Sequence, residues 1–174
     1  SLGYRPDEQI CIVTVGGSGV GRSLLERVIA AFAEAKRRLP ALRMIVVAGP
    51  RIDPASLVAT AQPGLEILPY VDQLYRHLAA CDLAVVQGGL TTTMELAANR
   101  RPFIYFPLRH HFEQNFHVRH RLERFGAGRC MDFEHAGPSE IAAAIVDEIA
   151  RPAVNAAVDA GGARRAAALI AELL

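Results

Sequence analysis

The stretch "ICIVTVGGSGVGRSLLERVIAAF", residues 10–32, holds an apolar segment, a glycine-rich loop and an amphipathic segment in that order. Ile10–Val15 is apolar apart from Thr14, which is typical of a strand buried on both faces. We expect a helix over Ser23–Arg38, because its large apolar residues recur on one side: Leu24, Leu25, Val28, Ile29 and Phe32. A buried strand followed directly by a helix is the repeating unit of parallel α/β folds.

The same alternation continues along the chain. Apolar runs predict further strands over Met44–Ala48, Leu65–Leu68, Leu83–Val86, Pro102–Pro107 and Arg129–Phe133. Helical spacing predicts a short helix capped by Asp72 and running through Ala79, then helices over Met94–Ala98, about Glu113–Phe125, Pro138 to about Ala150, and Ala163–Leu174. Right-handed crossovers place such helices on both faces of the sheet. The pattern therefore predicts an α/β, Rossmann-like, doubly wound sheet of six parallel strands.

Length and charge limit the possible functions. A chain of 174 residues is long enough for one well-buried domain and too short for two of full size. Its 19 basic and 18 acidic side chains give a net charge of +1, so no global field attracts nucleic acid. Apolar runs are too short for a membrane span, and no charged-then-apolar leader is seen, so we expect a cytoplasmic location. The start at Ser1 suggests a single domain, residues 1–174, cut from a longer two-domain enzyme.

The three cysteines point to a reducing environment. Cys11, Cys81 and Cys130 are odd in number, far apart, and in or beside apolar runs. This favours buried, reduced thiols over disulfides or metal ligands.

The loops after the strands are where function is expected. In doubly wound sheets a ligand lies beyond the carboxyl ends of the strands, where the chain changes direction. These loops are Gly16–Gly21, Gly49–Asp53, Tyr70–Asp72, Gln87–Thr93 and Leu108–Asn115. The first and the fourth contain paired glycines followed by hydroxyl residues.

The first loop comes close to a P-loop. Gly16 and Gly21 have the required spacing, but Arg22 stands where the lysine should be, and no predicted strand ends in a magnesium-binding aspartate. Arg22 also occupies the third glycine position of a dinucleotide fingerprint. Neither motif is therefore met. Two interpretations remain: backbone N–H groups that approach an anion at a helix start, or a tight turn without a ligand.

The fourth loop carries more information. "QGGLTTTMELAA", residues 87–98, brings Gln87, Gly88, Gly89, three threonines and Glu95 to the start of a helix. Phosphate oxygens would accept from the N–H and hydroxyl groups, while Glu95 would accept from vicinal hydroxyls such as those of a ribose. Helix capping by one threonine and Glu95 is the alternative, but it leaves the paired glycines and the other threonines unexplained.

The loop "PLRHHFEQN", residues 107–115, places Glu113 and Gln114 at a helix start, where they would hydrogen-bond a polyhydroxyl ligand. His117 shares a helix face with Glu113 or His120, which raises a metal hypothesis. We expect no metal, because nothing else in the chain supplies the third and fourth ligands.

These motifs together resemble the donor-binding signature of GT-B glycosyltransferases. The run from Gln87 through Glu95 to Gln114 has the order of that signature, and "GGSGVG" is similar to the first loop in the C-terminal half of the MurG-like UDP-GlcNAc transferases. The resemblance covers nearly the whole chain. It implies the C-terminal half of a GT-B fold, which binds a nucleotide sugar, with UDP the expected nucleotide, and no cofactor.

The resemblance also implies roles for individual residues. Gly16, Gly17 and Ser18 would lie at the pyrophosphate or the domain cleft, and Tyr70 and Val71 would present backbone to a uracil. The fourth loop, including Gly89, Thr91, Thr92 and Thr93, would contact the diphosphate. Glu95 would bind the ribose, and Glu113 and Gln114 the sugar. Two features depart from the pattern: Gln87 replaces a frequent histidine, and there is no tryptophan to stack on the base.

The implied enzyme moves a hexosyl group from the donor to an acceptor hydroxyl. Its general base and acceptor site would come mainly from a missing N-terminal domain, which would also carry any membrane association. The isolated chain is then expected to be nearly inactive. Two other functions stay open: a non-catalytic nucleotide- or partner-binding module, and a UDP-GlcNAc 2-epimerase using His110, His111 and Glu113.

Overall fold

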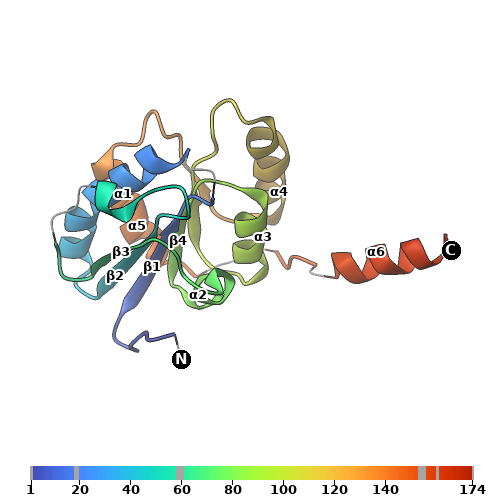
Figure 1. Cartoon of the computed structure of the whole chain (residues 1–174), viewed down its shortest axis with the longest axis horizontal. Helices are drawn as coiled ribbons and strands as arrows, with labels where there is room; N and C mark the ends of the chain where they lie inside the picture. The colour runs from blue at the N-terminus through green and yellow to red at the C-terminus, as the bar shows by residue number, and fades with distance from the viewer. Residues whose placement is uncertain (1, 18–19, 58–60, 153–155, 160, 174) are drawn as a thin grey trace.

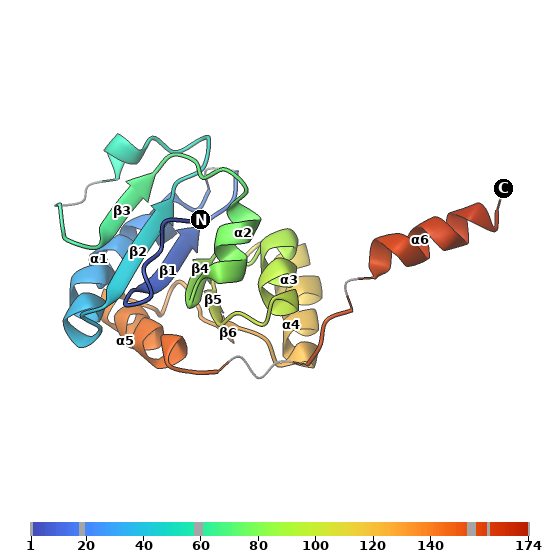
Figure 2. The same ribbon diagram turned by 90° about the horizontal axis from the view of Figure 1, so that it is seen from below.

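The computed structural model describes residues 2–17, 20–57, 61–152, 156–159 and 161–173. Within these residues, six strands form one sheet in the order β3-β2-β1-β4-β5-β6. Figure 1 labels β1 to β4, and Figure 2 labels all six. The strands are β1 (Gln9–Thr14), β2 (Leu42–Val47), β3 (Leu65–Leu68), β4 (Leu83–Val86), β5 (Phe103–Tyr105) and β6 (Arg129–Cys130). All neighbours pair in parallel. The predicted doubly wound α/β sheet is confirmed.

Helices cover both faces of the sheet (Figure 2). One face packs against α1 (Arg22–Arg38) and α5 (Pro138–Ile149). The other packs against α2 (Leu74–Ala80), α3 (Leu90–Ala98) and α4 (Arg119–Phe125). Strand β1 serves both layers, because Cys11 and Val13 face the first and Ile10 and Ile12 the second. This explains why β1 is apolar at nearly every position.

Two helices begin at different residues from those predicted. Helix α3 begins at Leu90, four residues before the expected Met94, since Thr93 donates its hydroxyl to the carbonyls of Gly89 and Leu90 within the helix. Helix α2 begins after Gln73, which adopts a left-handed conformation, and no side chain caps it. The expected Asp72 cap is therefore wrong.

Three further elements differ in extent or type. The chain leaves β6 after Cys130 because Asp132 forms a turn, accepting from the Glu134 N–H. The helix expected over 113–125 starts as a π-helix (Glu113–Val118) before it becomes α4. A short 3₁₀ helix (Pro54–Ser56) lies in the loop before β3.

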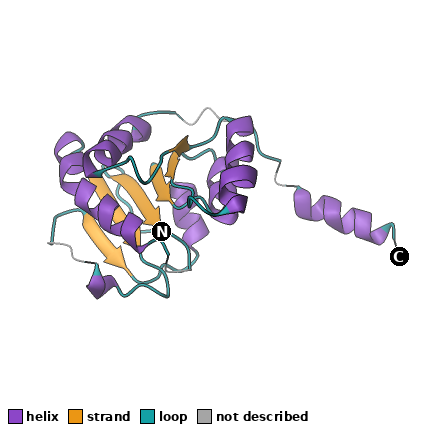
Figure 3. Cartoon of the chain, turned by 90° about the horizontal axis from the view of Figure 1, so that it is seen from above, coloured by secondary structure: helices purple, strands orange, loops and turns teal. Residues whose placement is uncertain are grey.

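The last helix, α6 (Gly162–Ala171), stands away from the sheet and its layers (Figure 3). None of its residues is buried. Its start agrees with the predicted Ala163, and Leu174 lies outside the described residues. Among the described residues, no helix has the length and apolar character needed to cross a bilayer.

The cysteines differ in their surroundings. Cys11 and Cys81 are buried as expected, but Cys130 is exposed at the end of β6, so the prediction of three buried thiols is wrong for that residue. Burial raises the pKa of Cys81 to about 12 and raises that of Cys11 further. Burial also raises the pKa of Cys130, although its side chain is reachable from solvent.

Iodoacetamide at about pH 8 is expected to modify Cys130 and spare Cys11 and Cys81 in the folded chain, because alkylation needs an accessible thiolate. All three cysteines should react in denaturant. Peptide mass spectrometry after timed labelling measures this. Modification of Cys81 at the rate of Cys130 in the folded chain would contradict the burial described above.

Gly128 has little room for a side chain. Its φ is +70°, and a Cβ there would lie 2.3 Å from Cε2 of Phe103, a buried ring. Gly126 has a similar φ of +63° but nothing within 4 Å of the added carbon.

Gly126→Ala should lower the free energy of unfolding by about 1–2 kcal/mol through left-handed strain alone. Gly128→Ala should lower it by roughly 1–3 kcal/mol more, because the core is also overpacked. Urea unfolding of both variants tests the difference. Equal losses would show that Phe103 moves aside without cost.

Candidate functional site

The site lies where neighbouring strands send their chains to opposite faces. Strands β1 and β4 are adjacent, yet β1 leads into α1 on one face and β4 into α3 on the other. Loops that part in this way leave a crevice at the carboxyl edge of the sheet. A cavity of about 420 Å³ lies there, and we call it the switch-point pocket. Its lining residues are Thr14, Val15, Gly16, Gly17, Val20, Val86, Gln87, Gly89, Thr92, Leu108, His111 and Gln114.

Two helix N-termini lie at this edge. Gly21 and Gly89 are the N-caps of α1 and α3, and neither helix has a side-chain cap. The first intrahelical bond of α3 runs from the Thr93 N–H to the Gly89 carbonyl. The N–H groups of residues 90–92 therefore have no acceptor inside the helix. Such groups, together with the positive end of the helix dipole, attract an anion.

The turn after β4 depends on Gly88. This residue is buried and has a φ of +90°, and a Cβ on it would lie 3.4 Å from Cα of Pro107. The left-handed conformation and the close approach of the loop that follows β5 both favour glycine at this position. The turn sets Gly89 at the start of α3, beside the pocket.

The three threonines of α3 have different surroundings. Thr92 lines the switch-point pocket, whereas Thr91 is exposed and does not. Thr93 is fully buried, and its hydroxyl is 2.9 Å from the Gly89 carbonyl, to which it donates. The expectation that Thr93 contacts a phosphate is therefore corrected, since its hydroxyl lies within the helix. Glu95 is half-buried and follows Thr92 by three residues, which puts both on one side of α3.

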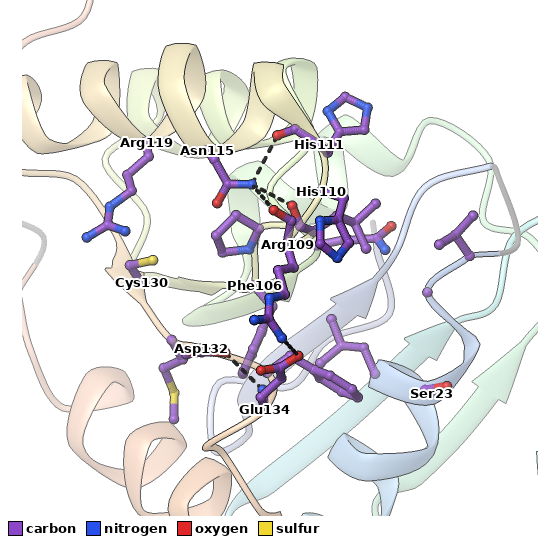
Figure 4. A pocket seen from close by; sticks show the side chains of 18 of the residues that line it. Ser23, Phe106, Arg109, His110, His111, Asn115, Arg119, Cys130, Asp132 and Glu134 are labelled. Atoms are coloured by element: carbon purple, nitrogen blue, oxygen red, sulfur yellow. Dashed lines mark hydrogen bonds and ion pairs between the residues drawn. The ribbon is translucent and has the colours of Figure 1, made fainter.

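Two amide side chains hold the loop that follows β5. Gln114 is 9% exposed and lines the pocket, and its Oε1 accepts from the Leu108 N–H at 2.9 Å. Nδ2 of Asn115 donates to the carbonyls of Leu108, Arg109 and His111 (Figure 4). Asn115 was not predicted from the sequence, because a single amide at a helix start has no spacing that marks it. Glu113 is exposed and does not line the pocket.

The remaining predicted residues lie elsewhere. Tyr70 is 69% exposed on the loop after β3, while Val71 packs against the core on the α2 and α3 side. Neither lines the switch-point pocket, so their contact with a base stays a prediction. Ser18 lies outside the described residues.

Arg22, at the position of a P-loop lysine, is held away from the pocket. Its Nε is 2.8 Å from Glu26, and its Nη2 donates to the Ser56 carbonyl at 2.8 Å. It is not among the residues that line the switch-point pocket. This arrangement agrees with the rejection of a P-loop hydrolase on sequence grounds.

A second cavity of about 720 Å³, which was not predicted from the sequence, adjoins the first. It lies between the start of α1 and the loops after β5 and β6 (Figure 4), and the two cavities share Val20, Gln87, Leu108 and His111. An ion pair between Arg109 and Glu134 joins the two loops. In the part of the chain that the structure describes, no three His, Cys, Asp or Glu side chains are grouped as a metal site requires.

The three residues named for an epimerase do not all line one cavity. His110 and His111 line the larger cavity, but Glu113 lines neither of the two. Acid and base groups must reach one substrate carbon, so this arrangement does not favour epimerisation.

Comparison with known proteins identifies relatives of the whole chain. A protein from Methylobacterium radiotolerans, named UDP-N-acetylglucosamine--N-acetylmuramyl-(pentapeptide) pyrophosphoryl-undecaprenol N-acetylglucosamine transferase, is 31% identical over 98% of the chain and 49% of its own length. The protein of the same name from Corynebacterium jeikeium is 32% identical over 98% of the chain and 47% of its own length. The chain spans about half the length of the curated relatives it matches.

Solved glycosyltransferases have a similar fold. MurG from Acinetobacter baumannii matches with a TM-score of 0.65 and 19% identity, over 83% of this chain and 42% of that one. VinC in complex with DTDP matches with a TM-score of 0.66 and 18% identity, over 87% of this chain and 36% of that one. The family model described as "Glycosyltransferase family 28 C-terminal domain" matches residues 10–174. The chain therefore belongs to the glycosyltransferase family 28 C-terminal domain family.

Proposed function

We propose that this chain binds the UDP moiety and the sugar of a UDP-sugar donor in the switch-point pocket. The observation that carries the proposal is the N-terminus of α3, which brings Gly89, Thr92 and N–H groups without helical acceptors to one cavity. A diphosphate fits this set of donors, because its oxygens only accept hydrogen bonds. The VinC complex with DTDP shows that a nucleoside diphosphate binds to a protein of this fold.

The same donors would assist transfer. When the sugar leaves the donor, negative charge develops on the diphosphate. Preformed N–H dipoles at a helix start stabilise that charge without having to reorganise during the reaction. The pocket is thus suited to stabilise the leaving group.

Other residues would bind the rest of the donor, and of these Gln114 lines the pocket itself whereas Glu95, Tyr70 and Val71 do not. Glu95, one turn beyond Thr92, would accept from the ribose hydroxyls. The Oε1 atom of Gln114 already accepts from Leu108, so Nε2 is the atom with which Gln114 would donate to a sugar hydroxyl. Tyr70 and Val71 would provide backbone groups for the base.

The complete enzyme would contain a preceding domain that supplies the acceptor site and the general base. The curated relatives are named as N-acetylglucosamine transferases, which makes UDP-N-acetylglucosamine the first donor to test. The acceptor of this protein would be a hydroxyl compound. We expect the isolated chain to bind the donor and to turn it over little, and we expect the enzyme to work on the cytoplasmic side of the cell.

Thr92→Ala and Glu95→Ala should each weaken UDP binding by about 1–3 kcal/mol, because each removes a hydrogen bond to the ligand. Isothermal titration calorimetry on the isolated chain measures the effect. Thr91→Ala is the matched control, since it removes the same hydroxyl from the preceding position of α3 without touching the pocket.

Unchanged UDP affinity in both Thr92→Ala and Glu95→Ala would refute the site assignment. An effect of Thr91→Ala equal to that of Thr92→Ala would show that the ligand lies over the exposed side of α3. Circular dichroism of each variant separates loss of binding from loss of fold.

A further inference from the structure

A third cavity, of about 340 Å³, lies at the amino edge of the sheet, opposite the switch-point pocket. Its lining includes Phe103 and Arg129, which are the first residues of β5 and β6. We call it the amino-edge pocket, and its charged lining residues are Arg101, Arg129, Glu148 and Arg151. Among the described residues, none lines both this cavity and the switch-point pocket.

Three guanidinium groups and one carboxylate line the amino-edge pocket. Glu148 is 8% exposed, and its Oε1 atom pairs with Nη1 of Arg129 at 3.5 Å and with Nη1 of Arg151 at 3.1 Å. Arg129 also pairs at 3.6 Å with the exposed Asp147, which does not line the pocket. The lining therefore carries a formal charge of +2, from three arginines and one glutamate.

Arg101 supplies the charge that the protein leaves uncompensated. In the part of the chain that the structure describes, Arg101 takes part in no ion pair, and its Nε atom is buried with no hydrogen-bond partner. A buried donor without an acceptor lowers stability, and more so when the group is charged. An anion in the pocket would provide the acceptor that Arg101 lacks.

The main chain of Arg101 is fixed by the end of α3. Its N–H donates to the Leu96 carbonyl at 3.0 Å, and the Arg100 N–H donates to the Ala97 carbonyl at 3.1 Å. Arg100 has a φ of +50°, so these bonds form the left-handed Schellman end of a helix. Arg101 thus enters β5 from a defined position, which lowers the entropy that its guanidinium loses when it binds a ligand.

The helix dipoles offer a simpler reason for arginines at this edge. Arg101 and Arg151 follow the ends of α3 and α5, where positive charge is favourable. This explains a positive charge near the helix ends. It does not explain a buried Nε–H group, because a carbonyl at a helix end would serve as its acceptor and none does so.

We propose that the amino-edge pocket binds the phosphate group of a small anion. A phosphate monoester carries about −1.5 to −2 charges at pH 7, which matches the formal charge of the lining. Its oxygens also suit the paired N–H groups of a guanidinium, whereas a carboxylate carries one charge and two oxygens. The cavity volume is at the lower end of the range of small-molecule sites, so the anion is a small one.

The test is a titration of the ¹⁵N-labelled chain with inorganic phosphate, followed by NMR at constant ionic strength. We expect the Arg101 Nε–H signal and the main-chain N–H signals of Gly126 and Gly128, which line the pocket, to shift. Arg101→Gln should weaken this binding by about tenfold or more, because it removes hydrogen bonds from a charged donor. Arg151→Gln, at an exposed side chain, should weaken it by roughly twofold to fivefold.

A second titration with glycerol 3-phosphate distinguishes the two sources of the phosphate group. Tighter binding of glycerol 3-phosphate would identify a monoester as the ligand, and tighter binding of inorganic phosphate would identify the free ion. Either result supports the proposal, provided that the shifts occur at the amino-edge pocket.

Arg100→Gln is the matched control, because it removes the same charge from an exposed side chain one position earlier, outside the pocket lining. It should bind phosphate like the unmodified chain, and thermal unfolding shows whether each variant is folded. Equal weakening by Arg100→Gln and Arg101→Gln would overturn the proposal. Shifts confined to residues 89–92 would also overturn it while supporting the donor site, so the two assignments fail independently.

Discussion

The adjacency of β1 and β4 is the constraint on which the site depends. These strands pair in parallel from Cys11 with Leu83 to Thr14 with Val86, and their chains then part to opposite faces of the sheet. Parallel pairing sets both carboxyl ends at one edge, and the parting leaves room between the loops. Helices α1 and α3 both begin beside this crevice, so the N–H groups and the positive dipole ends at their N-termini face the same space. Backbone topology therefore provides the electrostatics of the pocket, and side chains refine it.

Periodicity made most of the fold predictable from the sequence. Apolar runs located all six strands, since a strand buried on both faces leaves little room for polar residues. The predicted ends of helices and strands were wrong where a side chain forms a hydrogen bond with nearby main-chain groups. Thr93 satisfies its hydroxyl inside α3 and so allows that helix to start at Leu90, and Asp132 stops β6 by forming a turn. The π-helical turn was also unpredictable, because its apolar residues fit an ordinary helix equally well.

The candidate site was predictable at the level of loops rather than of atoms. Glycine pairs after β1 and β4 pointed to the edge of the sheet where the switch-point pocket lies, and six of the fourteen candidate residues line that pocket: Gly16, Gly17, Gln87, Gly89, Thr92 and Gln114. Sequence cannot tell three consecutive threonines apart, because only the rotation of the helix decides that Thr92 faces the cavity and Thr93 the core. It also gave no sign of the cavity between the β5 and β6 loops, which is formed by residues distant in the chain such as Ser23 and Met131.

The hydrogen bonds of Asn115 to the loop after β5 affect which positions of this protein tolerate substitution. Its amide binds three main-chain carbonyls, and Gln114 binds a main-chain N–H, so the loop keeps its course whatever side chains it carries. Positions 108–111 are thus open to substitution at small risk to the fold. Selection, or an engineer building a library, can vary the chemistry at the shared wall of the two cavities without rebuilding the scaffold.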